Sequence, residues 1–235
     1  MIKVILWDID GTLLDFEKAE KEAIRKCFEL FELGECTDEM IARYSVINKR
    51  YWERLERKEM TKPEILVGRF REFFETEGIV TDCAENFNSE YQVRLGDTIC
   101  FCDDGYELVK GLKDRVKQCA VTNGTKVAQD KKLNKSGLID LFDGIFISED
   151  IGEEKPDIKF FEHVWNEIGH YESDEVIIIG DSLTSDMKGG NNAGILTCWY
   201  NPKGLENTNG VKIDYEIDNL QKILEILEFY VCSNM

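Results

Sequence analysis

The chain has 235 residues, 43% of them hydrophobic, and carries a formal net charge of −18 at pH 7. This length fits one large domain or a core with a smaller cap, and the negative charge argues against binding of polymeric nucleic acid, whose phosphates would be repelled. No apolar stretch approaches the ~20 residues that span a bilayer, and the amino terminus lacks a basic region followed by a long apolar one, so we expect a cytoplasmic protein without membrane contact.

The first predicted strand spans residues 2–8 and leads into Asp8-Ile9-Asp10-Gly11-Thr12. Residues two apart on a strand point to the same face, so we expect the two carboxylates to project together at the carboxyl edge of a sheet, where open α/β sheets place ligands. Two adjacent acids repel each other unless a cation neutralises them, and the usual cation beside a phosphate is Mg²⁺. The alternative is a solvated turn, because Asp and Gly are common turn residues.

Residues 15–97 contain no convincing strand, and their apolar residues recur at helical spacing. Thr61-x-x-Glu64, with Pro63 in the first turn, predicts a helix start, and Asp82-x-x-Glu85 is another plausible start. We therefore predict a helical cap over residues 15–97, inserted into an α/β core that is formed by residues 1–14 and 98–235.

Strands and helices alternate in the rest of the chain. Strands are predicted at residues 117–122, 143–148, 175–180 and 195–200, and a sixth is possible at 213–217. This alternation is typical of a doubly wound, mostly parallel sheet with a Rossmann-like core.

Polar residues follow three of these later strands. Thr122-Asn123 precedes a predicted helix at residues 126–133, so it forms either an anion site at a helix start or an ordinary cap. Pro156 in the first turn of a helix to Glu167 could hold Lys155 at the mouth of the sheet, although a lone lysine is usually a solvated charge. Gly180-Asp181 and Asp186 again place carboxylates at a strand exit.

In this order, the four segments resemble the motifs of haloacid dehalogenase-like hydrolases, and the resemblance covers nearly the whole chain. Within that superfamily the chain is similar to bacterial pyrimidine 5'-nucleotidases of the house-cleaning type. The segments that carry this narrower similarity are Ile47-Asn48-Lys49, Gly68-Arg69-Phe70, Ile147-Ser148-Glu149 and Thr197-Cys198-Trp199. The resemblance implies a phosphatase with a helical cap.

It also implies roles for individual residues. Asp8 would be the nucleophile that forms an aspartyl-phosphate, and Asp10 would be the general acid and base. Mg²⁺ would be held by Asp8, the backbone carbonyl of Asp10 and Asp181, with Asp186 as an orienting group or a further ligand. Thr122 and the N–H of Asn123 would bind phosphoryl oxygens, while Lys155 would offset charge on the nucleophile and the phosphoryl group.

The predicted substrate is a small phosphate monoester, most specifically a pyrimidine nucleoside 5'-monophosphate. Candidate contacts to it are Phe16, Asn48, Lys49, Trp52 and Arg69, each of which could instead be a packing residue or a surface charge of the cap. Three alternatives stay open: a phosphatase of sugar phosphates or phosphoglycolate, a phosphosugar mutase, and a regulatory binding module without activity. A haloacid dehalogenase does not need an acid two residues after the nucleophile, so Asp10 favours phosphate chemistry.

The remaining chemistry-bearing residues predict neither a zinc site nor disulfides. The eight cysteines contain no Cys-x-x-Cys pair and are expected to be free thiols. His163 and His170 lack paired metal-ligand spacing, so we expect packing or surface roles for both. The sequence is compatible with a monomer or a homodimer.

Overall fold

A computed structural model describes residues 1–232 of the protein, with side chains described to residue 227. Its six strands form one sheet in the order β3-β2-β1-β4-β5-β6, and every neighbouring pair is parallel. The strands are β1 (Val4–Trp7), β2 (Lys117–Thr122), β3 (Gly144–Ile147), β4 (Val176–Gly180), β5 (Leu196–Tyr200) and β6 (Tyr215–Ile217). The predicted doubly wound sheet is confirmed, including its sixth strand.

Alternating side chains of β1 pack against two different layers of helices, as the two-residue period of a strand requires. Ile5 and Trp7 belong to the cluster that contains Leu108 of α5 (Gly105–Leu112). Val4 and Leu6 belong to the cluster with the phenylalanines of α8 (Ile158–Ile168). A strand buried on both faces reads as a continuous apolar run, which explains why β1 and β4 show no polar alternation.

The core is completed by α6 (Lys126–Ser136), α7 (Ser148–Ile151), α9 (Lys188–Ala193), α10 (Ile223–Cys232) and the short turns η1 (Leu138–Asp140), η2 (Ser173–Glu175), η3 (Leu183–Met187) and η4 (Leu220–Lys222). The short element η4 precedes α10 directly, and the side chain of Asn219 caps it by accepting a bond from the Gln221 N–H. The turn η3 is a single π-helical turn that follows β4 directly.

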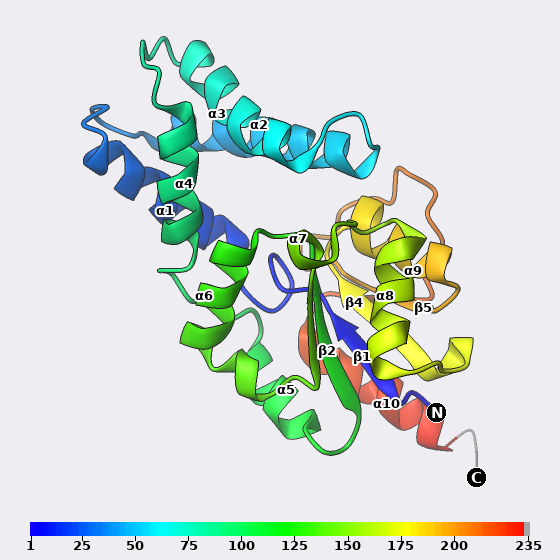
Figure 1. The fold of residues 1–235 in the computed structure, drawn as a ribbon. Helices are drawn as coiled ribbons and strands as arrows, with labels where there is room; N and C mark the ends of the chain where they lie inside the picture. Colours follow the sequence, from blue (N-terminus) through cyan, green and yellow to red (C-terminus); the bar gives the residue numbers. More distant parts are fainter. Residues whose placement is uncertain (233–235) are drawn as a thin grey trace.

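The helices α1 (Phe16–Leu30), α2 (Asp38–Glu56), α3 (Lys62–Thr76) and α4 (Ala84–Leu95) pack on one another around a hydrophobic cluster of their own. They lie together above the carboxyl edge of the sheet (Figure 1). The capping box of Thr61 and Glu64 begins α3 as predicted. By contrast, α4 begins at Ala84 with Cys83 as its cap, so its side-chain signal at Asp82 is not used.

Two chain crossings join these helices to the sheet, and they hydrogen-bond to each other. The N–H of Asp15 donates to the carbonyl of Cys100 at 2.9 Å, and the N–H of Cys102 donates to that of Leu13 at 3.0 Å. The two crossings therefore form a short antiparallel ribbon beneath the helices.

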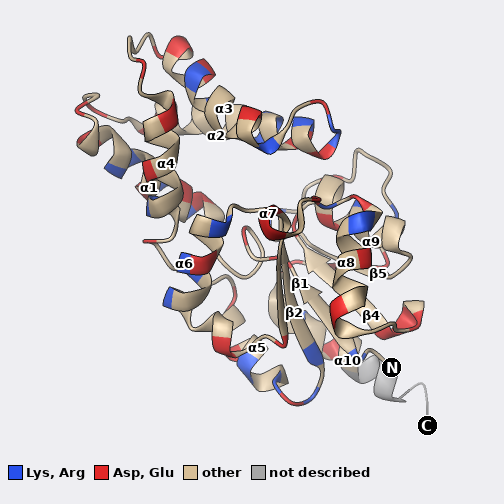
Figure 2. Cartoon of the chain, viewed as in Figure 1, with Lys and Arg blue, Asp and Glu red and all other residues tan. Residues whose placement is uncertain are grey.

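Acidic and basic residues are interspersed along the helices of both parts of the molecule (Figure 2). His163 and His170 are exposed, in agreement with a surface role. Seven cysteines within the described residues are free thiols, as expected. None of the helices up to residue 232 combines the length and the apolar character that crossing a membrane requires.

Candidate active site

Three acidic residues of the chain, Asp8, Asp181 and Asp186, lie together where the strand order reverses. The sheet runs outward from β1 to β2 and β3 on one side and from β4 to β5 and β6 on the other, so the switch point lies between β1 and β4. Asp8 follows β1, and its N–H donates to the carbonyl of Ile179 in β4 at 2.9 Å. Asp181 follows β4 directly. Ligands of open α/β sheets bind at this position.

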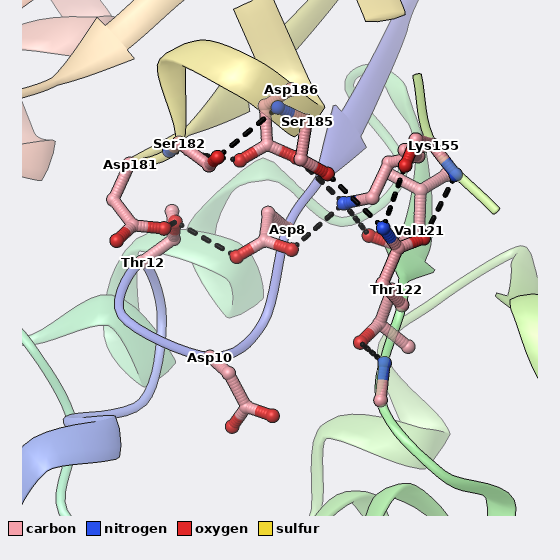
Figure 3. A network of polar contacts seen from close by, with 12 residues as sticks. Asp8, Asp10, Thr12, Val121, Thr122, Lys155, Asp181, Ser182, Ser185 and Asp186 are labelled. Carbon is pink, nitrogen blue, oxygen red and sulfur yellow. Dashed lines mark hydrogen bonds and ion pairs between the residues drawn. The ribbon is translucent and has the colours of Figure 1, made fainter. Parts of the chain in front are cut away.

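Asp8 is buried and held from both sides. Its Oδ1 accepts a hydrogen bond from the Lys155 ammonium at 2.8 Å, and its Oδ2 accepts one from the Thr12 hydroxyl at 3.1 Å (Figure 3). Burial raises the pKa of Asp8 to about 7, with a further upward contribution from Asp186 and a downward one from Lys155. The carboxylate therefore depends on neighbouring positive charge to stay ionised at neutral pH.

Lys155 supplies that charge from the loop after α7. Its side chain is 1% exposed, and besides Asp8 it donates to Asp186 Oδ1 at 2.6 Å and to the carbonyl of Val121 at 2.7 Å. Burial lowers the pKa of Lys155, but the carboxylates of Asp186 and Asp8 outweigh burial and raise it above its ordinary value. The lysine is thus ionised and saturated with acceptors.

Asn123, and not Pro156, holds Lys155 in place. The Asn123 side chain donates to the Lys155 carbonyl at 2.8 Å and accepts from its N–H at 2.9 Å. The prediction that Pro156 lies in the first turn of a helix is wrong, because α8 begins at Ile158 with Asp157 as its cap. The Lys155-Pro156 sequence therefore predicts a helix start two residues too early.

Thr122 lies at the end of β2, facing the same network (Figure 3). Its hydroxyl accepts a hydrogen bond from the N–H of Gly124 at 3.1 Å, and this bond stabilises the turn after β2. This internal bond agrees with an ordinary cap and leaves the hydroxyl proton free to donate to an anion.

Asp8, Asp181 and Asp186 each offer a carboxylate oxygen, and these oxygens lie within 4.8 Å of one another. Two glycines make room for them: a Cβ on Gly11 would lie 2.6 Å from Asp181 Oδ2, and one on Gly180 would lie 2.2 Å from Asp186 Oδ2. Burial and the charges of its neighbours raise the pKa of Asp181 well above its ordinary value. Such a crowded set of hard oxygen donors fits a divalent cation.

Both carboxylate oxygens of Asp186 accept hydrogen bonds from the protein. Its Oδ1 binds Lys155, and its Oδ2 accepts a hydrogen bond from the N–H of Ser182 at 3.1 Å. The π turn η3 brings it back toward the sheet, with Ser182 accepting from the Ser185 N–H at its start. Asp186 therefore orients Lys155 while remaining within the carboxylate cluster.

Asp10 does not share a face with Asp8, which corrects the sequence-based expectation. The strand β1 ends at Trp7, and the chain turns back at Ile9, whose carbonyl accepts from Leu13 and Leu14. The two-residue period of a strand therefore does not extend to Asp10. Its carboxylate lies apart from the network around Asp8 (Figure 3).

Two residues that the sequence did not single out bind Asp10. Gln129 of α6 donates to its Oδ2 at 2.7 Å, and Lys132 of the same helix forms an ion pair with its Oδ1. Both lie about 120 positions from Asp10. Only their spacing of three on a predicted helix hinted that they share a face.

The candidate substrate residues of the cap have different environments. Asn48 and Arg69 are buried and bonded to each other, with Arg69 Nη1 donating to Asn48 Oδ1 at 2.6 Å. Lys49 is exposed, whereas Phe16 and Trp52 are half-buried. The pairing of Asn48 with Arg69 favours a packing role for these two, and substrate contact by any of the five stays a prediction.

Glu56 is a further residue near the site that the sequence did not indicate. It ends α2, and its Oε2 is buried without a hydrogen-bond partner among the described residues. Burial raises the pKa of Glu56 to about 7, opposed by a hydrogen bond from Thr184 of η3. A cap carboxyl thus reaches the turn that carries Asp186.

The chain is a doubly wound α/β protein whose switch point carries a buried aspartate paired with a lysine. A family model described as haloacid dehalogenase-like hydrolase matches residues 5–200. The chain belongs to this family, which confirms the resemblance seen in the sequence.

Individual relatives agree with this assignment. The HAD-hydrolase YfnB of Bacillus subtilis is 36% identical over 225 residues, which cover 96% of this chain and 95% of that protein. Its crystal structure, bound to magnesium, matches with a TM-score of 0.90 at 35% identity, covering 96% of this chain and 98% of that chain.

Two relatives are named as nucleotidases. The pyrimidine 5'-nucleotidase PynA of Streptococcus pneumoniae is 36% identical over 228 residues, or 96% of this chain and 95% of that protein. The pyrimidine 5'-nucleotidase YjjG of Escherichia coli is 26% identical over 223 residues, or 95% and 96%. The predicted enzyme class, a phosphatase, is supported by these relatives.

Proposed function

We propose that this protein is a Mg²⁺-dependent phosphomonoester hydrolase that acts through an aspartyl-phosphate and prefers pyrimidine nucleoside 5'-monophosphates. The observation that carries the proposal is the buried pair of Asp8 and Lys155 beside the carboxylate cluster. A carboxylate kept ionised in a buried position, next to a site with room for a cation, is suited to attack a phosphate dianion.

In the first half-reaction, a carboxylate oxygen of Asp8 attacks phosphorus in line with the leaving oxygen. A bond from Asp8 to phosphorus forms, and the bond to the leaving oxygen breaks with its electron pair going to that oxygen. Asp10 in its protonated form gives the leaving oxygen a proton, a step that contributes ~10² to 10⁴-fold in rate. Lys155 and Thr122 offset the negative charge of the phosphoryl oxygens.

In the second half-reaction, water attacks the phosphorus of the aspartyl-phosphate. Asp10, now a carboxylate, takes a proton from that water, and the bond between Asp8 and phosphorus breaks with its electron pair returning to Asp8. Inorganic phosphate and the starting enzyme result. The same residue thus serves first as acid and then as base.

Asp8, Asp181 and the backbone carbonyl of Asp10 would hold the Mg²⁺, with Asp186 as an orienting group or a further ligand. The ion would neutralise charge on the phosphoryl group. Two observations support this assignment: the carboxylate oxygens of the cluster lie within 4.8 Å of one another, and the relative YfnB was crystallised with magnesium.

We also propose that residues 15–97 form a cap that selects the leaving group. Support comes from the separate hydrophobic cluster of α1 to α4 and from their position above the carboxyl edge of the sheet (Figure 1). Trp52 and Phe16 are half-buried aromatic side chains of this part and are suited to stack on a nucleoside. The nucleotidase names of PynA and YjjG favour pyrimidine nucleotides.

A substrate screen tests the proposal. We expect pyrimidine nucleoside 5'-monophosphates to have a higher kcat/KM than sugar phosphates or phosphoglycolate. Trp52→Ala should lower nucleotide turnover more than p-nitrophenyl phosphate turnover. A sugar phosphate that exceeds every nucleotide by about tenfold would exclude the nucleotidase but keep the phosphatase mechanism, and conversion of a sugar phosphate into its isomer would show a mutase.

Asp8→Asn tests the nucleophile itself. The substitution nearly preserves volume but removes the attacking oxygen, so turnover should fall by at least ~10³-fold with an unchanged circular dichroism spectrum. A variant that keeps turnover within about tenfold of wild type would exclude the covalent mechanism. Absence of any phosphatase activity in the wild-type protein would favour a regulatory module.

A further inference from the structure

Two side chains of α6 bind the carboxylate of Asp10. Gln129 and Lys132 lie three positions apart on this helix and therefore share a face. Gln129 donates from Nε2 to Asp10 Oδ2 at 2.7 Å, and Lys132 pairs through Nζ with Asp10 Oδ1. Each oxygen of the carboxylate thus has its own donor from the same helix.

Both donors are almost completely removed from solvent. Gln129 is 0% exposed and the Lys132 side chain 1% exposed, whereas the Asp10 side chain keeps 21% of its surface accessible. Burying an ammonium group is costly unless it is paired. The helix therefore presents fixed donors to an acid that itself remains open to a ligand.

Gly124 and Phe16 lie beside the side chains of Gln129 and Lys132. A Cβ on Gly124 would lie 2.1 Å from Gln129 Nε2, so a larger residue there would displace the amide from its present position. The Phe16 ring lies over Lys132, with Nζ 5.3 Å from the ring centroid. This cation–π contact stabilises the buried ammonium group.

The two contacts do not exhaust the hydrogen-bonding capacity of Asp10. A carboxylate has about four lone-pair sites on its two oxygens, and Gln129 and Lys132 use one on each. A site remains on each oxygen for a proton that is given to the leaving group or taken from water. The helix can therefore fix the direction of the carboxyl group without blocking its chemistry.

We propose that Gln129 and Lys132 are positioning residues that hold Asp10 for proton transfer. This inference rests on the proposed function, in which Asp10 is the general acid and base. Without the two donors, the side chain of Asp10 would rotate among its ordinary rotamers, and misplacement of a catalytic group by about 1 Å can cost ~10²-fold in rate.

The test compares two phosphate monoesters of similar shape, phenyl phosphate and p-nitrophenyl phosphate. Phenolate is much the more basic leaving group and needs the proton, whereas p-nitrophenolate departs without it. The ratio kcat/KM reports the steps up to formation of the aspartyl-phosphate. A defect in positioning the acid should therefore appear in kcat/KM for phenyl phosphate and spare p-nitrophenyl phosphate.

Lys132→Met keeps most of the length of the side chain and removes its charge. We expect kcat/KM for phenyl phosphate to fall ~10 to 10²-fold and that for p-nitrophenyl phosphate to fall by less than about threefold. Gln129→Met should show the same asymmetry, and Lys132→Arg should restore most of the phenyl phosphate activity. Lys126→Met, on the exposed start of the same helix, is the matched control and should leave both values unchanged.

Equal losses on the two substrates, no loss, or a gain in the Lys132→Met and Gln129→Met proteins would overturn the inference, because a purely structural contact does not distinguish leaving groups. Asp10→Asn separates this failure from failure of the proposed function. If Asp10→Asn shows the leaving-group asymmetry and neither α6 variant does, only the positioning role is wrong. If Asp10→Asn also lacks it, the general-acid role of Asp10 is wrong.

Discussion

The buried carboxyl group of Glu56 should make the folding stability of the protein depend on pH. Its Oε2 is buried without a partner among the described residues, and burial raises the pKa of the carboxyl to about 7. A carboxyl whose pKa is higher in the folded state contributes stability that is fully present below the unfolded pKa. That contribution is lost as the pH rises through the folded pKa.

Glu56→Gln should therefore remove a pH-dependent penalty. The unfolded pKa of a glutamate is near ~4.3, so the wild-type protein should lose about 3 kcal/mol of stability through this group between pH 4 and pH 8. We expect the variant to gain stability relative to wild type at pH 8 and to match it near pH 4, measured by urea unfolding in chelator. The neighbouring, more exposed Glu53→Gln is the control, and identical pH dependence in wild type and Glu56→Gln would contradict the assignment.

Some residues of the candidate site could be predicted from the sequence and others could not. Asp8, Lys155, Asp181 and Asp186 could be nominated because each follows a buried strand or its loop, and parallel strands end at one edge. The hydrogen-bond partners of Asp10 could not be predicted from the sequence. They lie more than a hundred positions away, and their contact with Asp10 depends on how α6 is rotated about its axis. Glu56 was missed for the same reason: a glutamate at a helix end ordinarily faces solvent.

At the scale of elements, a chain of polar contacts runs through the interior of α1 to α4. Glu20 accepts from Asn48 at 2.8 Å, Asn48 accepts from Arg69 at 2.6 Å, and Arg69 also donates to Asn88 at 3.1 Å. Gln92 donates to Asn88 at 3.1 Å, and its oxygen accepts from Thr125, the cap of α6, at 2.7 Å. The network thereby connects the cap to the helix that holds Asp10.

Arg69→Met should destabilise the cap strongly, because it leaves the oxygens of Asn48 and Asn88 with fewer donors and removes positive charge near the buried Glu20. Burial already raises the pKa of Glu20. We expect a loss of about 3 kcal/mol in the free energy of unfolding, measured with urea. Arg71→Met, which breaks an exposed pair with Glu85, should change it by less than about 0.5 kcal/mol. Equal effects of the two substitutions would argue against the network.

The types of the helices and strands and their order along the chain could be predicted, because the sequence patterns that specify them are local. The continuous apolar runs of β1 and β4, the helical spacing in α1 and the capping box of α3 each specify one element. Element ends followed less well, as with α4 and α8, because a capping residue competes with proline and acidic signals nearby. The order of the strands was not predicted, because it depends on long-range packing that the local signals do not specify.

At the scale of the whole molecule, the helices α1 to α4 and their connections also contact the core at residues outside the chain crossings. Lys62 at the start of α3 donates to Ser148 at 2.6 Å, and Lys58 pairs with Asp157. Together with Glu56 and Thr184, these contacts connect the end of α2 and the start of α3 to the loops around Lys155 and Asp186.

Removal of the metal tests whether this assembly works as proposed. Activity should disappear in excess chelator and return with Mg²⁺, while Ca²⁺ should substitute poorly because its coordination is longer and looser. Asp181→Ala should weaken Mg²⁺ binding, measured by titration calorimetry, by at least about tenfold. Full activity in chelator, or unchanged Mg²⁺ affinity of the variant, would show that the carboxylate cluster does not hold the ion.

The stereochemical course at phosphorus tests the central claim, a covalent aspartyl-phosphate on Asp8, most directly. The substrate is a monoester made chiral at phosphorus by isotopic or sulfur substitution and hydrolysed in isotopically labelled water. Each in-line displacement inverts the configuration. Attack by Asp8 followed by attack of water therefore predicts net retention, whereas net inversion would show that water attacks the substrate directly and would contradict the account.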